Sequence, residues 1–128
     1  KGRQGERFAV CLAETDDLIG ELFADKEGED TYSIGWNFNL KFGKKGYAAE
    51  AARAMMDALF CADARRIYAY AEEDNLASRR LCEKLGMRQE GLFLEFISFV
   101  KGEDGAPIYE NTCQYAILKR EWEQRSKQ

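Results

Sequence analysis

One short segment carries residues whose types and spacing suit phosphate binding, Gly43-Lys44-Lys45-Gly46-Tyr47-Ala48. It lies between an apolar run, Tyr32 to Leu40, that is typical of a strand, and a helical pattern that starts at Ala48. A strand that turns through glycines into a helix leaves free backbone N–H groups at the positive end of the helix dipole. We therefore interpret the segment as a candidate phosphate-binding loop for a nucleotide-like ligand. The alternative is that Gly43 and Gly46 only supply turn geometry.

The chain has no histidine, and this absence limits the chemistry that it can perform. Ser-His and Cys-His nucleophilic pairs are excluded, and the commonest metal ligand is missing, so we expect no metal site. Any catalysis must use carboxylates, hydroxyls, backbone amides or the reactivity of a cofactor. The cysteines stand singly, without a CxxC pair, which favours buried thiols over a disulfide framework or a zinc site. They are Cys11, Cys61, Cys82 and Cys113.

Length and charge narrow the class of protein. The 128 residues fit one domain with a substantial core, because 45% of them are hydrophobic. The net charge of −4 and the scattered basic residues argue against nucleic acid or an anionic membrane as a partner. No apolar run approaches the ~20 residues that span a bilayer, and the start, Lys1 to Gly5, lacks the apolar core of a signal peptide. We expect a cytoplasmic protein.

Hydrophobic periodicity predicts the elements that must position the loop. Two short apolar runs, 8–12 and 18–23, are separated by turn-prone residues and predict an antiparallel hairpin. The run from Tyr32 adds a third strand, in which Gly35 marks a bulge or a close approach to the backbone. From Ala48 the apolar residues recur at three- and four-residue steps and predict an amphipathic helix that ends near Ala62.

The second half of the chain continues the alternation. Residues 66–71 read as a strand, and a second helix follows Asn75 and stops at Gly86. Strand, helix, strand and helix imply a right-handed crossover and a partly parallel sheet, and hence an α/β fold. Two more strands, 93–101 and 109–118, precede a polar stretch, 119–128.

Taken in order, these pieces closely resemble the GNAT N-acetyltransferases, which use acyl-CoA. The resemblance rests on the glycine loop, on Glu73-Asp74-Asn75-Leu76-Ala77-Ser78, on Glu83-Lys84-Leu85-Gly86-Met87 and on Glu90-Gly91. It covers the chain from about Leu18 to Trp122, and the nearest branch is the ribosomal-protein N-terminal alanine acetyltransferases. It implies the GNAT fold, a mixed and mostly antiparallel sheet whose central parallel strands splay apart. It also implies an N-terminally truncated domain, 1–128, that lacks the family's first strand and helices.

The resemblance implies acetyl-CoA as the co-substrate and assigns its site. The family's loop pattern is Gln or Arg, two residues, Gly, one residue, then Gly or Ala, and its amides bind the coenzyme A pyrophosphate. Here Gly43 stands in the first position of that pattern, and Lys44 and Lys45 either add charge or are merely solvated. The preceding strand would pair with the pantetheine arm, and Gly35 becomes a candidate bulge. The implied cofactor-binding residues are Phe38, Asn39, Leu40, Gly43, Lys44, Lys45, Gly46, Tyr47, Ala48, Asn75 and Ser78.

The chain departs from the family's pattern at the proton-transfer groups. Asn75 and Ser78 match family positions near the thioester, although an N-cap at Asn75 explains the same residues structurally. Many members place a tyrosine general acid seven residues after the motif asparagine, and that position here is Cys82. Ser78 is therefore the candidate acid, in keeping with the alanine acetyltransferase branch. The Cys82 thiol could also protonate a leaving thiolate, but a single cysteine on a helix face is more often core packing.

The general base is also displaced from its usual position. Family members often carry a glutamate on the strand before the loop, and the matching residue here is Ser33. The candidate bases are then Glu90 and Glu95, near the last strands, with Glu50 a weaker choice. Surface carboxylates are, however, usually just solvated.

We therefore expect an N-acetyltransferase in which a primary amine attacks acetyl-CoA directly, without an acyl-enzyme. Amides of the 38–40 segment would stabilise the oxyanion. The acceptor is a protein N-terminus or a small-molecule amine, and the negative net charge favours a cationic one. An exposed sheet edge could be covered by a second copy, which would make a homodimer, or by another chain. The alternatives are a non-catalytic coenzyme-A-binding module and a phosphate-binding α/β fold unrelated to coenzyme A.

Overall fold

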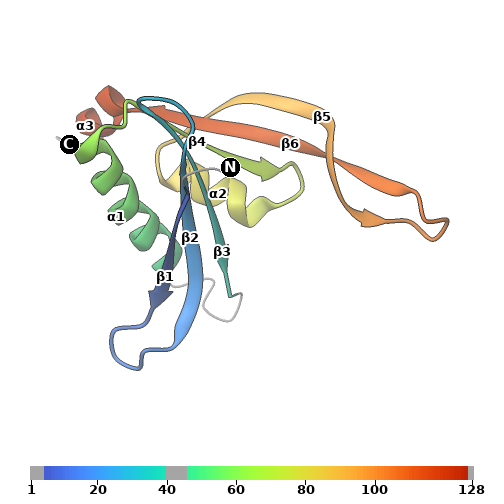
Figure 1. Ribbon diagram of the computed structural model, residues 1–128, viewed down its shortest axis with the longest axis horizontal. Coiled ribbons are helices and arrows are strands. Elements are labelled where there is room, and N and C mark those ends of the chain that lie inside the picture. Colours follow the sequence, from blue (N-terminus) through green and yellow to red (C-terminus); the bar gives the residue numbers. More distant parts are fainter. Residues whose placement is uncertain (1–4, 40–45, 127–128) are drawn as a thin grey trace.

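A computed structural model describes residues 5–39 and 46–126. Their strands form one six-stranded sheet (Figure 1). The strand order is β1-β2-β3-β4-β6-β5, and every neighbouring pair is antiparallel except β3 and β4, which are parallel. The elements are β1 (Gly5–Cys11), β2 (Leu18–Lys26), β3 (Thr31–Phe38), α1 (Tyr47–Ala62), β4 (Arg66–Glu72), α2 (Leu76–Lys84), β5 (Arg88–Lys101), β6 (Pro107–Leu118) and α3 (Lys119–Ser126). The predicted α/β class and mixed, mostly antiparallel sheet are confirmed.

The two parallel strands lie together at one end and diverge at the other. Their ladder pairs residues 31–34 of β3 with residues 66–69 of β4. Beyond it β3 continues to Phe38 and β4 to Glu72, and Figure 1 shows the two strands separating. The predicted splayed strands are confirmed, and an opening forms in the sheet where they part.

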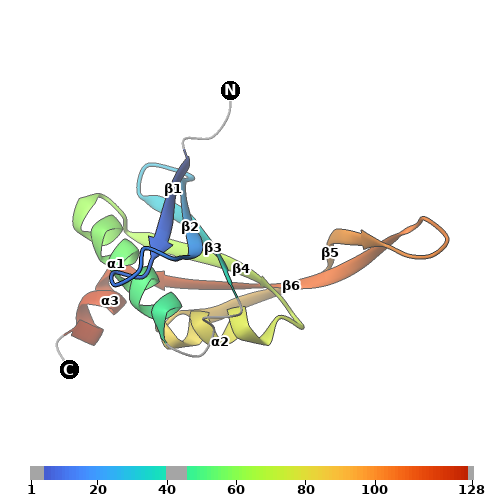
Figure 2. The same ribbon diagram turned by 90° about the horizontal axis from the view of Figure 1, so that it is seen from below.

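The helices α1 and α2 cover the same face of the sheet (Figure 2). The apolar residues of α1 form one stripe, because its buried residues recur at three- and four-residue steps from Ala49 to Phe60. They pack on alternate strand residues such as Ile67 and Ala69, and α2 adds Leu81. Successive strand residues point to opposite faces, so Tyr68 and Tyr70 lie on the face that α1 and α2 leave open.

The C-terminal stretch is a helix, which the sequence interpretation missed. Residues 119–126 form α3, and the Glu121 carboxylate accepts a hydrogen bond from the Leu118 N–H (2.8 Å) at its start. Trp122 is buried against Phe60, with ring centroids 5.7 Å apart, and donates a hydrogen bond to Asp57. A single apolar residue in a polar run gives no helical period, so the helix could not be inferred from the pattern.

Three further expectations need correction. Gly35 is not a bulge, because β2 and β3 keep a continuous register through the pair Phe23 and Gly35. A Cβ at Gly35 would lie 2.9 Å from the Phe23 ring, so the glycine admits that ring instead. β5 begins at Arg88 rather than at residue 93. Cys82 and Cys113 are buried as expected, whereas Cys11 and Cys61 are exposed.

Strands β5 and β6 run past the other strands and form a two-stranded arm (Figures 1 and 2). The arm carries exposed apolar side chains, among them Leu94 and Phe99, which are 70% and 64% exposed. No helix among the described residues is long and apolar enough to cross a membrane.

Candidate active site

The helix α1 begins at Tyr47, nine positions after the diverging strand β3 ends at Phe38. Gly46 is its N-cap, with a φ of 79° in the left-handed region, and the Glu50 N–H donates to the Gly46 carbonyl (3.1 Å). The N–H groups of the three residues before Glu50 have no acceptor within the helix, which makes this end attractive to an anion. A Cβ on Gly46 would meet nothing within 4 Å among the described residues, so the glycine is favoured by its φ and not by lack of space. Leu40, Gly43, Lys44 and Lys45 lie outside the described residues.

The backbone of β3 offers amides to the space that β4 leaves. The Asn39 N–H donates to the Ile19 carbonyl of β2 (2.8 Å) and is already used. Successive amides of a strand point to opposite sides, so the N–H groups of Trp36 and Phe38 point toward β4. The ladder to β4 ends at Ile34, before either residue. Of Phe38 and Asn39, the two expected backbone positions that the structure describes, Phe38 is therefore the one whose N–H points toward the opening.

The start of α2 meets the same place. Asn75 is its N-cap, and the Asn75 side chain accepts a hydrogen bond from the Ser78 N–H (3.2 Å). The Ser78 hydroxyl oxygen in turn accepts a hydrogen bond from the Trp36 indole N–H (3.2 Å). This bond joins α2 to β3 across the divergence and brings Ser78 to the diverging end of β3. Sequence reasoning did not identify Trp36, because nothing in its local pattern distinguishes it from a strand residue facing the core.

Arg79 holds the turn that leads into α2. Its guanidinium donates to the Glu73 carbonyl (2.9 Å) and to the Tyr115 hydroxyl (3.1 Å) on β6. Cys82, at the position of the family's tyrosine, is fully buried, and burial raises the pKa of its thiol to about 12. A buried thiol with so high a pKa is a core side chain, and Ser78 remains the hydroxyl at the site.

The structure does not bring Glu90 to Ser78. Its carboxylate is paired with Arg66 (2.8 Å) and Arg88 (3.0 Å), and Arg88 also pairs with Glu121 (2.5 Å). Arg66 is the first residue of β4 and Ser78 follows its last residue, so the two ends are roughly 20 Å apart along the strand. Hydrogen bonding from Arg66 holds the pKa of Glu90 below its usual value. Glu90 is thus a fixed member of an ion-pair network.

Glu95, in contrast, lies at the same end of the sheet as Ser78. It occupies an irregular part of β5, where its φ of 49° is unusual for a residue with a side chain. Its backbone N–H donates to the Asn111 side-chain oxygen (2.8 Å), and the Asn111 amide donates to the Glu73 carboxylate (2.9 Å). Asn111 therefore connects Glu95 to the turn that precedes Asn75.

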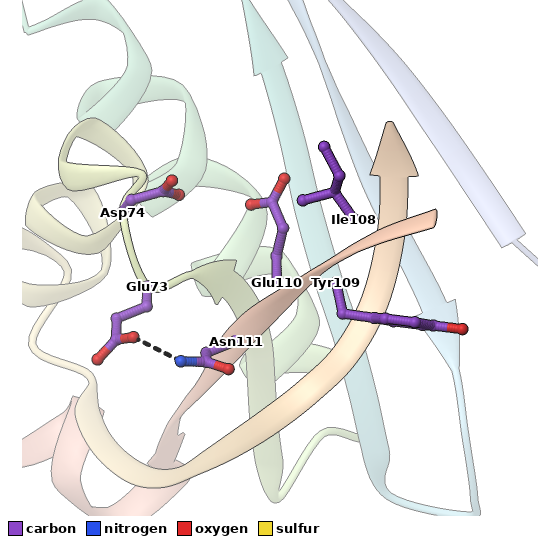
Figure 3. A pocket seen from close by; sticks show the side chains of 6 residues that line it. All are labelled: Glu73, Asp74, Ile108, Tyr109, Glu110 and Asn111. Atoms are coloured by element: carbon purple, nitrogen blue, oxygen red, sulfur yellow. Dashed lines mark hydrogen bonds between the residues drawn. The ribbon is translucent and has the colours of Figure 1, made fainter. Parts of the chain in front are cut away.

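An acidic pocket of about 300 Å³ adjoins this turn (Figure 3). The carboxylates of Glu73 and Asp74 line it from the turn, and Glu110 lines it from β6. Figure 3 shows the Tyr109 ring extending away from these carboxylates. Sequence reasoning did not single out the pocket, because only the β6 register brings Glu110 beside a turn that lies 36 residues earlier.

The sheet opens between the parallel strands β3 and β4, α1 follows the opening, and α2 is bonded across it to β3. This arrangement is that of the acyl-CoA N-acyltransferase fold. A family model for the GNAT acetyltransferase domain matches residues 1–88, and the chain belongs to this family of acetyltransferases. Among the described residues, no group of Cys, Asp and Glu side chains could hold a metal ion.

Several proteins are similar to the chain. The uncharacterized N-acetyltransferase YnaD of Bacillus subtilis is 42% identical over 124 residues, which are 95% of this chain and 69% of YnaD. A GNAT-family acetyltransferase structure from Bacillus anthracis is 38% identical, with a TM-score of 0.79 over 89% of this chain and 66% of that one. The spermidine/spermine N-acetyltransferase SpeG from Vibrio cholerae shares the fold, with a TM-score of 0.80 over 95% of this chain and 69% of SpeG, at 22% identity. The chain spans about two thirds of the length of these relatives.

Proposed function

We propose that residues 1–128 form the donor-binding part of an N-acetyltransferase domain that transfers acetyl from acetyl-CoA to a primary amine. One observation carries the proposal. Where β3 and β4 diverge, amides of β3 point into the opening between the two strands. The start of α2, capped by Asn75, is held at the same opening by the hydrogen bond from Trp36 to Ser78. Family membership argues against a fold unrelated to coenzyme A.

The donor would bind along this opening. The pyrophosphate would accept hydrogen bonds from the first-turn amides of α1, and we include residues 43–45 in the proposed loop. The pantetheine arm would pair with the β4-facing side of β3, as an added strand pairs with a sheet edge. The Phe38 N–H would then be the amide that stabilises the oxyanion.

Acetyl transfer needs one proton removed from the amine and one supplied to the leaving sulfur. The neutral amine nitrogen attacks the thioester carbon, a C–N bond forms, the C–S bond breaks and its electron pair goes to sulfur. Ser78 would donate its hydroxyl proton to that thiolate. Glu95 would accept the proton from the amine, directly or through a water. No acyl-enzyme is required, and positioning supplies most of the rate.

The acceptor that the geometry favours is a small amine with more than one positive charge. Glu73, Asp74 and Glu110 line one pocket beside the α2 start, and their negative charge would attract a second ammonium group while the first is acetylated. SpeG, which shares the fold, is described as a spermidine/spermine N-acetyltransferase, and spermidine and spermine are amines of this kind. A ribosomal-protein N-terminus, the acceptor of the branch that the sequence resembles, stays the alternative prediction.

A thiol-release assay over matched amines tests this function. Spermidine, propylamine and an alanine-initiated peptide would each be incubated with the chain and acetyl-CoA. We expect amine-dependent release of coenzyme A, with kcat/KM at least tenfold higher for spermidine than for propylamine and falling as salt is raised. Acetyl-CoA binding without release on any amine would instead identify a coenzyme-A-binding module.

We also propose that a second copy covers the arm. Eight apolar side chains of β5 and β6 are 36% to 70% exposed. At about 200 Å² for a side chain of this size, they leave on the order of 800 Å² per chain, divided between the two faces of the arm because successive strand residues point to opposite sides. An isolated two-stranded arm is marginally stable, so contact with a second copy would also support it. The eight residues are Leu92, Leu94, Phe96, Ile97, Phe99, Val100, Ile108 and Tyr109.

A further inference from the structure

A hydrogen bond from Trp36 reaches the hydroxyl group of Ser78, the proposed acid. The indole N–H of Trp36 donates to the Ser78 hydroxyl oxygen at 3.2 Å, between residues 42 positions apart in the chain. Trp36 is partly buried and packs against the core cluster, which limits the orientations of its ring. Ser78 is held from the other side, because its N–H is bonded to the Asn75 cap.

The chemistry of the two groups fixes the direction of this bond. An indole N–H can only donate, whereas a serine hydroxyl has one proton and two acceptor lone pairs. Trp36 therefore occupies one lone pair of the Ser78 oxygen and leaves the hydroxyl proton for another acceptor. An N–H that donates to an oxygen also stabilises negative charge on that oxygen, and so favours loss of its proton.

We propose that Trp36 is a positioning residue that orients Ser78 and makes its hydroxyl a better proton donor. The inference rests on the proposed function, in which Ser78 protonates the leaving thiolate. As the C–S bond breaks, the electron pair goes to sulfur and the Ser78 proton moves toward it. Negative charge develops on the Ser78 oxygen, and the hydrogen bond from the Trp36 N–H stabilises that charge. A proton from solvent restores the hydroxyl after coenzyme A, as the free thiol, leaves.

The test is a double-mutant cycle on the chain, read as kcat for acetyl-CoA with a saturating amine. We expect Trp36→Phe to lower kcat by on the order of tenfold, as loss of one hydrogen bond to a developing charge would, with KM for acetyl-CoA changed less than threefold. Replacing Trp36 by 3-benzothienylalanine, which keeps the bicyclic ring and lacks the N–H, should give the same loss. Because the benzothienyl ring fills the space of the indole, this second variant separates loss of the N–H from the cavity that phenylalanine would leave.

The cycle separates positioning from a merely structural role. In a Ser78→Ala background, Trp36→Phe should lower kcat less than twofold, because the group through which Trp36 acts is gone. An equal loss in both backgrounds would overturn the inference. So would a normal kcat for the benzothienylalanine variant while Ser78→Ala is slow, and that outcome would leave the proposed function intact. A normal kcat for Ser78→Ala would remove both the acid role of Ser78 and the inference, whereas acetyl transfer itself would stand.

Discussion

At the scale of single residues, the two carboxylates expected to act as bases differ in what surrounds them. Glu90 and Glu95 stand five positions apart on the same strand, and the sequence offers no reason to separate them. Their partners in the fold do separate them, because the Glu90 carboxylate forms ion pairs with Arg66 and Arg88 at one end of the sheet. Glu95 meets Asn111 at the other end.

Replacing Glu90 by glutamine should change stability and leave the chemistry alone. We expect Glu90→Gln to lower the free energy of unfolding by about 1–2 kcal/mol at pH 7, because Arg66 and Arg88 lose a charged partner. The pKa of Glu90 is lowered in the fold, so its stabilisation is present above the unfolded value of ~4.3 and is lost as the pH falls through the folded value. Urea unfolding of both proteins should therefore show the gap closing below that pH.

The kinetic control for this variant uses an exposed carboxylate of the arm. Both Glu90→Gln and Glu103→Gln should keep kcat/KM within twofold of the parent chain. A loss of a hundredfold or more in Glu90→Gln alone would return Glu90 to the reaction.

Glu95 gives the opposite expectation. We expect Glu95→Gln to lower kcat/KM by about a hundredfold, the usual contribution of a general base, and to remove the acidic limb of its pH profile. Glu95→Gly removes the same carboxylate and relaxes the positive φ, so it should lose the same rate without losing stability. Retention of full activity by both variants would exclude Glu95 as the base.

At the scale of elements, local patterns predicted most of the fold. Alternation and helical period located β2, β3, α1, β4 and α2, since each of these elements buries one clear face. The splay followed only from the family resemblance, because the divergence of two strands leaves no mark on either strand alone. α3 was missed, since one buried residue, Trp122, attaches it to the core.

Local sequence patterns also identified only some residues of the candidate site. Asn75 and Ser78 could be named from a motif, because they lie three positions apart at one helix start. Trp36 and Glu110 could not, since Trp36 bonds to a residue 42 positions away and Glu110 shares a pocket with Asp74, 36 positions earlier. Contacts of this kind depend on strand register, which short-range patterns do not carry.

The α1 start makes a prediction about coenzyme A. We expect Gly46→Glu to weaken acetyl-CoA binding by at least tenfold more than Gly46→Gln, because a carboxylate would repel the pyrophosphate at this helix end. Both side chains are strained by about 1–2 kcal/mol at a left-handed φ, so the pair isolates the charge. Calorimetric titration with acetyl-CoA measures the difference. Equal affinities for the two variants would remove the pyrophosphate from this end of α1.

At the scale of the whole molecule, the arm is the feature that the body of the fold leaves uncovered. We expect sedimentation equilibrium to find a dimer in the micromolar range, and Leu94→Asp with Phe99→Asp to convert it to a monomer by placing charges in the apolar contact. Leu18→Asp is the matched control, because Leu18 is also exposed, at 58%, and lies outside the arm. A monomeric parent chain, or dissociation caused equally by Leu18→Asp, would rule out the arm as the interface.

The central claim is that acetyl-CoA occupies the opening between β3 and β4, and amide chemical shifts measured during a titration test it most directly. In the isotope-labelled chain, acetyl-CoA should shift the amides of Phe38, Ala48 and Ser78, and leave those of Arg88 and Glu90 in place. Saturation of these shifts at one equivalent would give the site and its stoichiometry together. Shifts that gather elsewhere, or none at millimolar acetyl-CoA in a folded chain, would contradict the claim.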